Sequence, residues 1–159
     1  MSFFDIDFTV PGNPKALKRH RSFQKGQFKG TYDPSQNDKA DFLAKCLESK
    51  PAVPLDEPIH VSITFCFPRP KGHYRTGSKS HLLRDVAPKY HTGTPDLDNL
   101  EKFVADSLNG TFWKDDSRIC SNSNEKIYGE QGYIRIRVSK LNKFNNSLKE
   151  SDNGKSTEE

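Results

Sequence analysis

The stretch PDLDNLEKFVADSLNG, residues 95–110, predicts an amphipathic helix from about Asp96 to Asn109. Apolar side chains recur along it at the three- and four-residue spacing that places them on one helix face; they are Leu97, Leu100, Val104 and Leu108, with Phe103 on the flank. Gly110 follows at the position where helices commonly end in a left-handed residue. We therefore expect the leucine-rich face of this helix to pack on a core and the charged face to meet solvent.

Charged residues gather at the start of this helix and along one of its sides. Asp96 and Asp98 lie at the N-terminus, where the helix dipole and the free amide groups favour negative charge. Lys102 and Asp106 follow Asp98 at intervals of four residues, so the three side chains share one side of the helix. Taken singly, these features have simple explanations, as a helix cap and a solvated ion pair.

The turn after the helix adds two more carboxylates, Asp115 and Asp116, and a glycine-containing turn can bring them back toward the first pair. Several carboxylates near one point repel each other unless a cation lies among them. Oxygen ligands without thiols suit hard ions such as Mg²⁺ or Mn²⁺. With a lysine beside them, they form a site for in-line attack of water on a phosphodiester. The alternative for an isolated Asp-Asp pair is turn chemistry.

Strands and one further helix surround this motif. Alternation of apolar and polar residues, or β-rich composition, predicts four strands, at about residues 4–10, 59–67, 119–128 and 133–140. A helix is expected from an N-cap at Asp33 to about Ser49. The polar run SNSNE, residues 121–125, indicates an edge strand or the rim of a site. Trp113 is expected as a buried anchor that places the Asp-Asp turn.

Composition limits the class of protein. The 159 residues have the size of one domain, and 32% hydrophobic residues without a long apolar run exclude a membrane protein. The three cysteines, Cys46, Cys66 and Cys120, make a disulfide framework or a zinc knuckle improbable and favour a reducing cytoplasm. The first ten residues, MSFFDIDFTV, have acids where a signal peptide has bases. We therefore expect a cytoplasmic protein without a membrane partner.

Two basic segments favour a polyanionic partner, in keeping with the net charge of +4. The first, residues 15–29, is expected as a loop or ragged hairpin, and the second, residues 69–95, as a long irregular loop. Residues proposed to contact DNA phosphates are Lys15, Lys18, Arg19, Arg21, Arg69, Lys71, Arg75 and Lys79. The aromatic side chains in these segments are expected to pack the loops on the core, with stacking on DNA as the alternative; they are Phe23, Tyr74 and Tyr90. The histidines of the second segment, His73, His81 and His91, are expected to be exposed or to face DNA.

The string at residues 95–110, followed by Trp113, Asp115-Asp116 and Lys126, resembles the RusA family of Holliday junction resolvases. The resemblance covers about residues 4–138, and the approach PKYHTGTPDLDN resembles that of phage or prophage members. It implies an α/β (α+β) single domain over residues 1–139, with a mixed four-stranded sheet and two main helices, that forms a homodimer. Residues 140–159 are polar, have no net charge and are expected to be a disordered tail. Arg118 stands where the family usually has glutamine.

The resemblance also implies a role for each residue of the motif. It makes Asp96, Asp98 and Asp116 ligands of Mg²⁺, which Mn²⁺ is expected to replace, and Lys102 the catalytic lysine. Asn99, Asp106 and Asp115 match supporting positions, and Lys126 matches a basic position near the DNA.

The implied activity is that of a crossover junction endodeoxyribonuclease in the cytoplasm of a bacterial host. It would resolve four-way junctions by paired symmetric nicks that leave 5′-phosphate and 3′-hydroxyl ends. Two alternatives stay open at this point. One is a nuclease for other branched DNA, such as forks and flaps, and the other is an inactive protein that only binds junctions.

Overall fold

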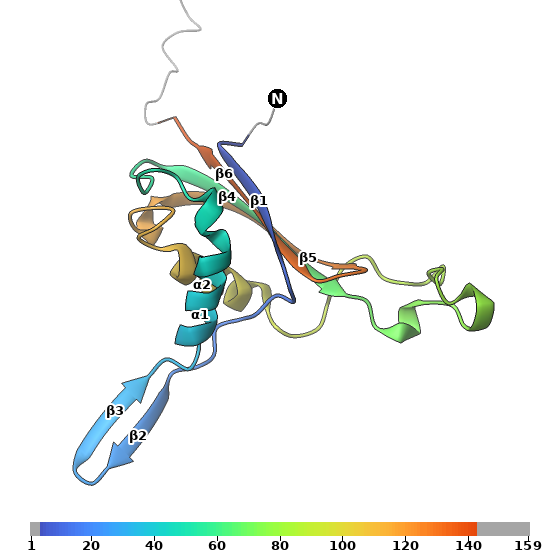
Figure 1. Cartoon of the computed structure of the whole chain (residues 1–159), viewed down its shortest axis with the longest axis horizontal. Coiled ribbons are helices and arrows are strands. Elements are labelled where there is room, and N and C mark those ends of the chain that lie inside the picture. The colour runs from blue at the N-terminus through green and yellow to red at the C-terminus, as the bar shows by residue number, and fades with distance from the viewer. Residues whose placement is uncertain (1–3, 143–159) are drawn as a thin grey trace, which may run out of the picture.

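The computed structural model of the chain describes residues 4–142 and contains one four-stranded sheet with two helices against one of its faces (Figure 1). The strand order is β1-β6-β4-β5, and the strands are β1 (Ile6–Pro11), β4 (Ile59–Pro68), β5 (Ile119–Gly129) and β6 (Tyr133–Lys140). β6 pairs antiparallel with β1 and β4, whereas β4 and β5 run parallel. The predicted α+β domain with a mixed sheet is therefore confirmed. β5 lies at the edge of the sheet, as its polar run indicated.

The core lies between the sheet and the two helices, α1 (Gln36–Cys46) and α2 (Leu97–Leu108). Alternate residues of β4 and β6 face the helices, so the inward face of each strand is apolar. Phe103 is 1% exposed and its ring lies 5.6 Å from that of Phe42, while Leu97 is only half-buried. The predicted apolar stripe of α2 is thus rotated toward Phe103, because α1 packs against that side.

The start of α1 differs from the expected one. The helix begins at Gln36 with Ser35 in the N-cap position, two residues later than predicted. The carboxylate of Asp33 accepts a hydrogen bond from the amide of Ser35 at 2.8 Å and pairs with Lys39 at 2.5 Å. Asp33 therefore organises the turn before the helix rather than capping it, and the bond from Lys39 lowers the pKa of this carboxyl. After α1, a 3-10 turn (Leu47–Ser49) ends the helical segment.

Two basic segments project from this body (Figure 1). The first is a hairpin of β2 (Arg21–Lys25) and β3 (Phe28–Tyr32), which confirms the expected hairpin. The second, residues 69–95, contains two short 3-10 turns, Lys71–His73 and Gly77–Lys79. Backbone hydrogen bonds close it on itself, for example from the amide of Arg84 to the carbonyl of His73 at 2.9 Å. The long loop is therefore an ordered arm.

Cys46 and Cys66 are buried, as expected of small core residues, and burial raises the pKa of the Cys46 thiol to about 12. No helix within residues 4–142 is long and apolar enough to cross a membrane. β6 continues to Lys140, and the amide of Leu141 donates to the carbonyl of Pro58 at 2.8 Å. Most of the predicted tail, residues 143–159, lies outside the described residues, so the disorder of the tail stays a prediction.

Candidate active site

Two carboxylates, those of Asp96 and Asp98, lie at the N-terminus of α2. Asp96 occupies the N-cap position with an extended backbone, but its side chain makes no capping hydrogen bond. Asp98 lies in the first turn, and both residues are exposed. The simple explanation of Asp96 as a helix cap is therefore wrong, and its carboxylate stays available to a ligand.

Lys102 follows one turn after Asp98 on the exposed side of α2. Within residues 4–142, no ion pair joins Lys102, Asp98 or Asp106 to a side chain of opposite charge. The second simple explanation, an Asp98–Lys102 pair along the helix, is therefore not realised. Asn99 is half-buried, and its carbonyl oxygen accepts a hydrogen bond from the amide of Leu17 at 3.4 Å. Asn99 thus links α2 to the basic segment that leads into the hairpin.

A hydrogen bond from the buried side chain of Trp113 links Asp116 to the core. The indole Nε1 of Trp113 donates to Oδ1 of Asp116 at 2.9 Å. Trp113 is fully buried, and its ring packs edge-on against Phe112 at 6.4 Å between centroids. The expectation that Trp113 is a buried anchor for the Asp-Asp turn is confirmed. One oxygen of Asp116 is therefore held by the core, in a turn that begins at this residue.

Asp115 has a different role in the same turn. Its Oδ2 accepts a hydrogen bond from the amide of Ser117 at 2.9 Å, in the N-cap position of the 3-10 turn Asp116–Arg118. Hydrogen bonds from the hydroxyl and the amide of Ser117 lower the pKa of this carboxyl. Asp115 therefore supports the turn that carries Asp116, which is the turn chemistry weighed for the pair.

Arg118 takes part in the packing of this turn on the loop before β4. Its guanidinium donates to Asp56 at 2.8 Å, and Lys114 reaches the second oxygen of the same carboxylate at 3.4 Å. The hydrogen bond from Arg118 is the main cause that lowers the pKa of Asp56. Arg118 thus has its own partner in this chain.

The three predicted metal ligands do not form a complete cation site by themselves. Within the described residues, no three aspartate, glutamate, histidine or cysteine side chains lie together as a group that could hold a metal ion. The donor set nevertheless suits Mg²⁺, because Asp96, Asp98 and Asp116 offer carboxylate oxygens without a thiol or an imidazole. Within residues 4–142, no hydrogen bond or ion pair engages the carboxylates of Asp96 and Asp98, so a hard cation fits the chemistry of these residues.

A cavity of about 160 Å³ lies between α2 and β5, beside Lys102 and Trp113. Its lining combines apolar side chains, among them Val61 and Ile63, with the polar residues Glu101, Asn122 and Asn124. The amide of Asn124 donates to the carboxylate of Glu101, and Oδ1 of Asn124 accepts from the amide of Ile63 at 3.0 Å. Sequence reasoning missed these three residues, although the polar run in β5 was the signal for a rim.

Lys126 makes two hydrogen bonds to the main chain that the sequence did not predict. Its ammonium donates to the carbonyl oxygens of Gly93 and Pro95 at 2.6 and 2.8 Å. These two carbonyls belong to the segment that leads directly to Asp96. Lys126 therefore holds the approach to the candidate site, and its place near DNA stays a prediction.

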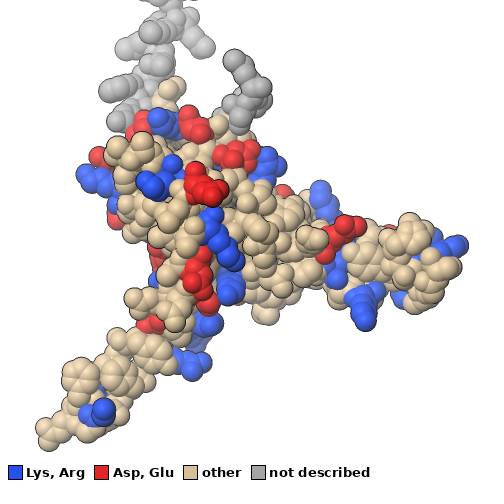
Figure 2. Space-filling model, viewed as in Figure 1, with Lys and Arg blue, Asp and Glu red and all other residues tan. Residues whose placement is uncertain are grey.

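The predicted DNA contacts divide into two groups. Four of them already have protein partners: Lys15 and Lys18 pair with Asp38, Arg75 pairs with Asp85, and Arg69 donates to the carbonyl of Pro88 and lies over the ring of Tyr128. The other four are exposed and form no ion pair within residues 4–142, namely Arg19, Arg21, Lys71 and Lys79. Figure 2 shows lysine and arginine side chains on both projections. Because exposed ion pairs contribute little, a phosphate can replace Asp38 or Asp85.

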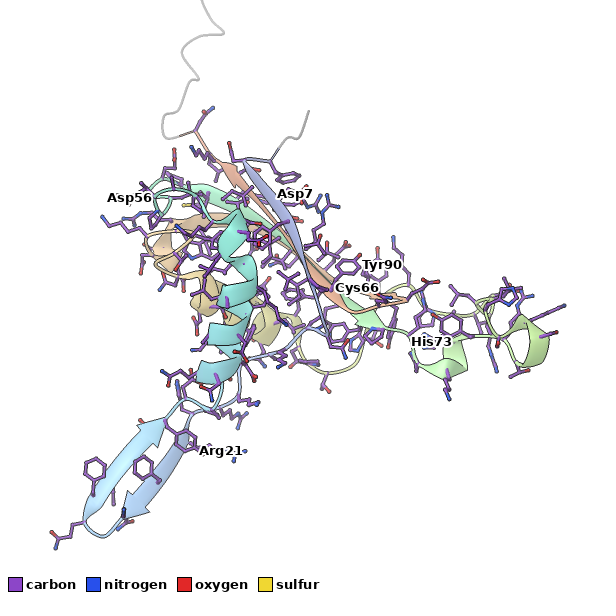
Figure 3. The ribbon with its side chains drawn as sticks, in the orientation of Figure 1. Asp7, Arg21, Asp56, Cys66, His73 and Tyr90 are labelled. Atoms are coloured by element: carbon purple, nitrogen blue, oxygen red, sulfur yellow. The ribbon has the colours of Figure 1, made fainter. Side chains whose placement is uncertain are left out.

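The base of the arm is an aromatic cluster rather than a set of free histidines. The ring of His91 stacks on Phe67 at 4.1 Å, and His73 meets Tyr128 edge-on at 4.8 Å. Burial lowers the pKa of His91, and the charge of Lys126 lowers it further. His73 and Tyr90 lie where the arm joins the sheet (Figure 3). His73 and His91 are half-buried in this cluster, so the expectation that they are exposed is wrong, whereas contact with DNA stays a prediction.

Replacing Trp113 by phenylalanine removes the only atom through which this side chain holds Asp116 and keeps an aromatic ring in the core. If Asp116 is a ligand of Mg²⁺ in a nuclease, as the resemblance implies, we expect cleavage to fall by about 10–100-fold, the range typical of a lost partner of a metal ligand, together with a higher Mg²⁺ requirement. Steady-state cleavage across a Mg²⁺ titration measures this. Phe112→Leu, in the neighbouring core position, controls for a loss of packing alone. An unchanged Mg²⁺ requirement would show that the indole only fills the core.

Replacing Lys126 by methionine tests its role as a positioning residue. If its ammonium orders the segment before Asp96, single-turnover cleavage should fall by about 10–100-fold, while the affinity for the junction and its salt dependence change little. If Lys126 instead contacts a phosphate, its replacement would lower the affinity for the junction and reduce the salt slope by about one. Lys71→Met, on the arm, is the matched variant, and we expect it to show the phosphate pattern.

Comparison with known proteins completes the description of this site. The family model described as Endodeoxyribonuclease RusA matches residues 11–139. A protein of Bacillus subtilis (strain 168), described as the uncharacterized protein YqaN, is 28% identical over 138 residues, which cover 84% of this chain and 94% of that protein. The range matched by the family model contains every candidate site residue discussed above.

Proposed function

The chain belongs to the RusA family of endodeoxyribonucleases, and on that premise we propose that it is a Mg²⁺-dependent nuclease that resolves four-way DNA junctions. The observation that carries this proposal is the state of the α2 N-terminus, where Asp96 caps nothing and Asp98 has no ion pair within residues 4–142. Such carboxylates interact with the helix through its dipole alone and stay available to a metal ion. Their availability supports a nuclease over an inactive protein that only binds junctions.

In the proposed site, Asp96, Asp98 and Asp116 hold the metal. When bound, Mg²⁺ lowers the pKa of a water and offsets the charge of the phosphodiester. Lys102, on the same side of α2 as Asp98, places a positive charge where negative charge develops on the phosphate during in-line attack. Trp113 fixes one oxygen of Asp116, so this carboxylate loses little freedom when a cation binds. The products carry 5′-phosphate and 3′-hydroxyl ends.

We further propose that the protein acts as a homodimer on branched DNA. A four-way junction offers two equivalent strands, and a two-fold symmetric dimer presents one active site to each. Paired nicks then follow from symmetry. The three cysteines are unpaired thiols in the described structure, in keeping with action on DNA inside a bacterial cell. An origin in a phage or prophage stays a prediction.

The deciding experiment compares a mobile four-way junction with a linear duplex made of the same arms, in Mg²⁺ and in EDTA. We expect paired, ligatable nicks on the junction only, and only with the metal. Mn²⁺ should restore the activity after chelation. Tight junction binding without cleavage in either metal would favour the inactive binding protein, and equal cleavage of forks or flaps would favour the broader nuclease.

A further inference from the structure

One face of the β2–β3 hairpin carries three exposed aromatic rings. The antiparallel register pairs Phe23 with Gly30, Arg21 with Tyr32 and Lys25 with Phe28. Side chains of directly paired residues share a face, so one face holds the three rings with a cation at each end. The other face holds the two remaining pairs, Ser22 with Thr31 and Gln24 with Lys29. We call the three rings the aromatic platform; they are Phe23, Phe28 and Tyr32, exposed by 44%, 66% and 47%.

The rings form a continuous surface. The ring centroid of Phe23 lies 6.1 Å from that of Phe28 and 6.3 Å from that of Tyr32. Gly30 makes this arrangement possible, because a Cβ atom at that position would lie 2.7 Å from Cζ of Phe23. The missing side chain therefore lets the central ring lie across β3.

The platform does not pack on the core. The hairpin extends away from the sheet and helices, with Arg21 near its root (Figures 1 and 3). None of its residues belongs to the buried core. The expectation that Phe23 packs its segment on the core is therefore wrong. A two-stranded hairpin is marginally stable alone, and three exposed aromatic rings on it indicate a surface that binds a partner.

Charge narrows the chemistry of that partner. Residues 11–32 contain no aspartate or glutamate, and their cationic residues are Lys15, Lys18, Arg19, Arg21, Lys25 and Lys29. A second copy of this hairpin would bring the same cations and be repelled. Single-stranded nucleic acid combines flat apolar rings with a negatively charged backbone, and aromatic side chains within a basic groove are the usual way to bind it.

We propose that the aromatic platform stacks on unpaired bases at the branch of a DNA substrate, while Arg21 and Lys25 bind the adjoining phosphates. This rests on the proposed function for the kind of DNA involved, and it adds a second binding element remote from the carboxylates. The hairpin then reads unstacked bases, which a branch point exposes and a continuous duplex does not.

The test uses the full-length protein and two fluorescent oligomers of equal length, one of thymidines and one of abasic sugar phosphates, which differ only in their bases. Base stacking predicts that the wild-type protein binds the thymidine oligomer on the order of 10-fold more tightly or better. The triple variant Phe23→Leu, Phe28→Leu, Tyr32→Leu should lose this preference and keep the same salt slope. The matched control changes the opposite face, with Ser22→Ala, Gln24→Ala and Thr31→Ala.

Equal binding of both oligomers by the wild-type protein would overturn the proposal. A triple variant that keeps its preference for the thymidine oligomer would also overturn it. The same holds for a variant that loses this preference only because the proposed dimer dissociates, which a measurement of the molar mass in solution reveals. The single variant Phe28→Leu, at the most exposed ring, should give a partial loss without affecting the hairpin fold. Junction cleavage by the wild-type protein tests the proposed function separately, so base preference without cleavage would reject the nuclease and leave the platform standing.

Discussion

Asp116→Asn and Asp96→Asn should each abolish junction cleavage and leave junction binding intact or tighter. In the proposed site, an amide of the same shape would remove a negative charge that holds Mg²⁺ and that repels the phosphate. At position 116 the amide oxygen can still accept the bond from Trp113, so the turn should keep its geometry. We expect a rate loss of at least about 1000-fold, equivalent to ~4 kcal/mol of transition-state stabilisation.

Single-turnover cleavage and a binding titration in Ca²⁺ or EDTA separate the two effects. Asp41→Asn, an exposed carboxylate on α1, removes one negative charge away from the site and serves as the control. The thermal unfolding of the variants should match that of the wild-type protein, because Asp96 makes no side-chain cap. Loss of binding together with cleavage would mean that these carboxylates hold the fold instead of a metal.

Lys102→Met should lower the cleavage rate by about 100–1000-fold, a typical effect of losing one group that stabilises transition-state charge. The affinity for junction DNA and the Mg²⁺ concentration for half-maximal activity should stay near the wild-type values, in contrast to the aspartate variants. Lys102→Arg should restore part of the rate, because it returns the positive charge with a different shape. Lys102 lines the cavity between α2 and β5 and has no ion pair within residues 4–142.

Lys45→Met, at the exposed end of α1, is the matched control for the loss of one lysine. A proportional rise in KM with an unchanged kcat would assign Lys102 to substrate binding alone. A shifted Mg²⁺ requirement would instead place its effect on the carboxylates.

Much of the fold follows from local patterns. Apolar spacing and Gly110 place the second helix at 96–109, and the structure has it at Leu97–Leu108. Alternation places the central strand at 59–67, within one residue of β4. Such patterns succeed because the backbone conformation of a short segment depends largely on its own side chains and on the periodicity of the face that they bury.

The site follows only in part. The sequence identifies the residues of the motif. It also predicts the role of Trp113, because a large aromatic side chain next to the Asp-Asp turn is expected to be buried. The sequence does not predict which partner each carboxylate binds. A cap at Asp96 and an ion pair between Asp98 and Lys102 were equally consistent with the pattern, and neither forms.

By itself, the sequence determined the order of helices and strands, the motif and the basic character of two segments, all of which are properties of neighbours along the chain. Only the tertiary structure decided that Lys126 holds the carbonyls of Gly93 and Pro95 and that Phe23 points away from the core. Lys126 meets partners more than thirty residues earlier in the chain, and helix α2 and the Asp-Asp turn lie between them in sequence. No periodicity encodes such a contact, because it depends on how the sheet and the arm are placed against each other.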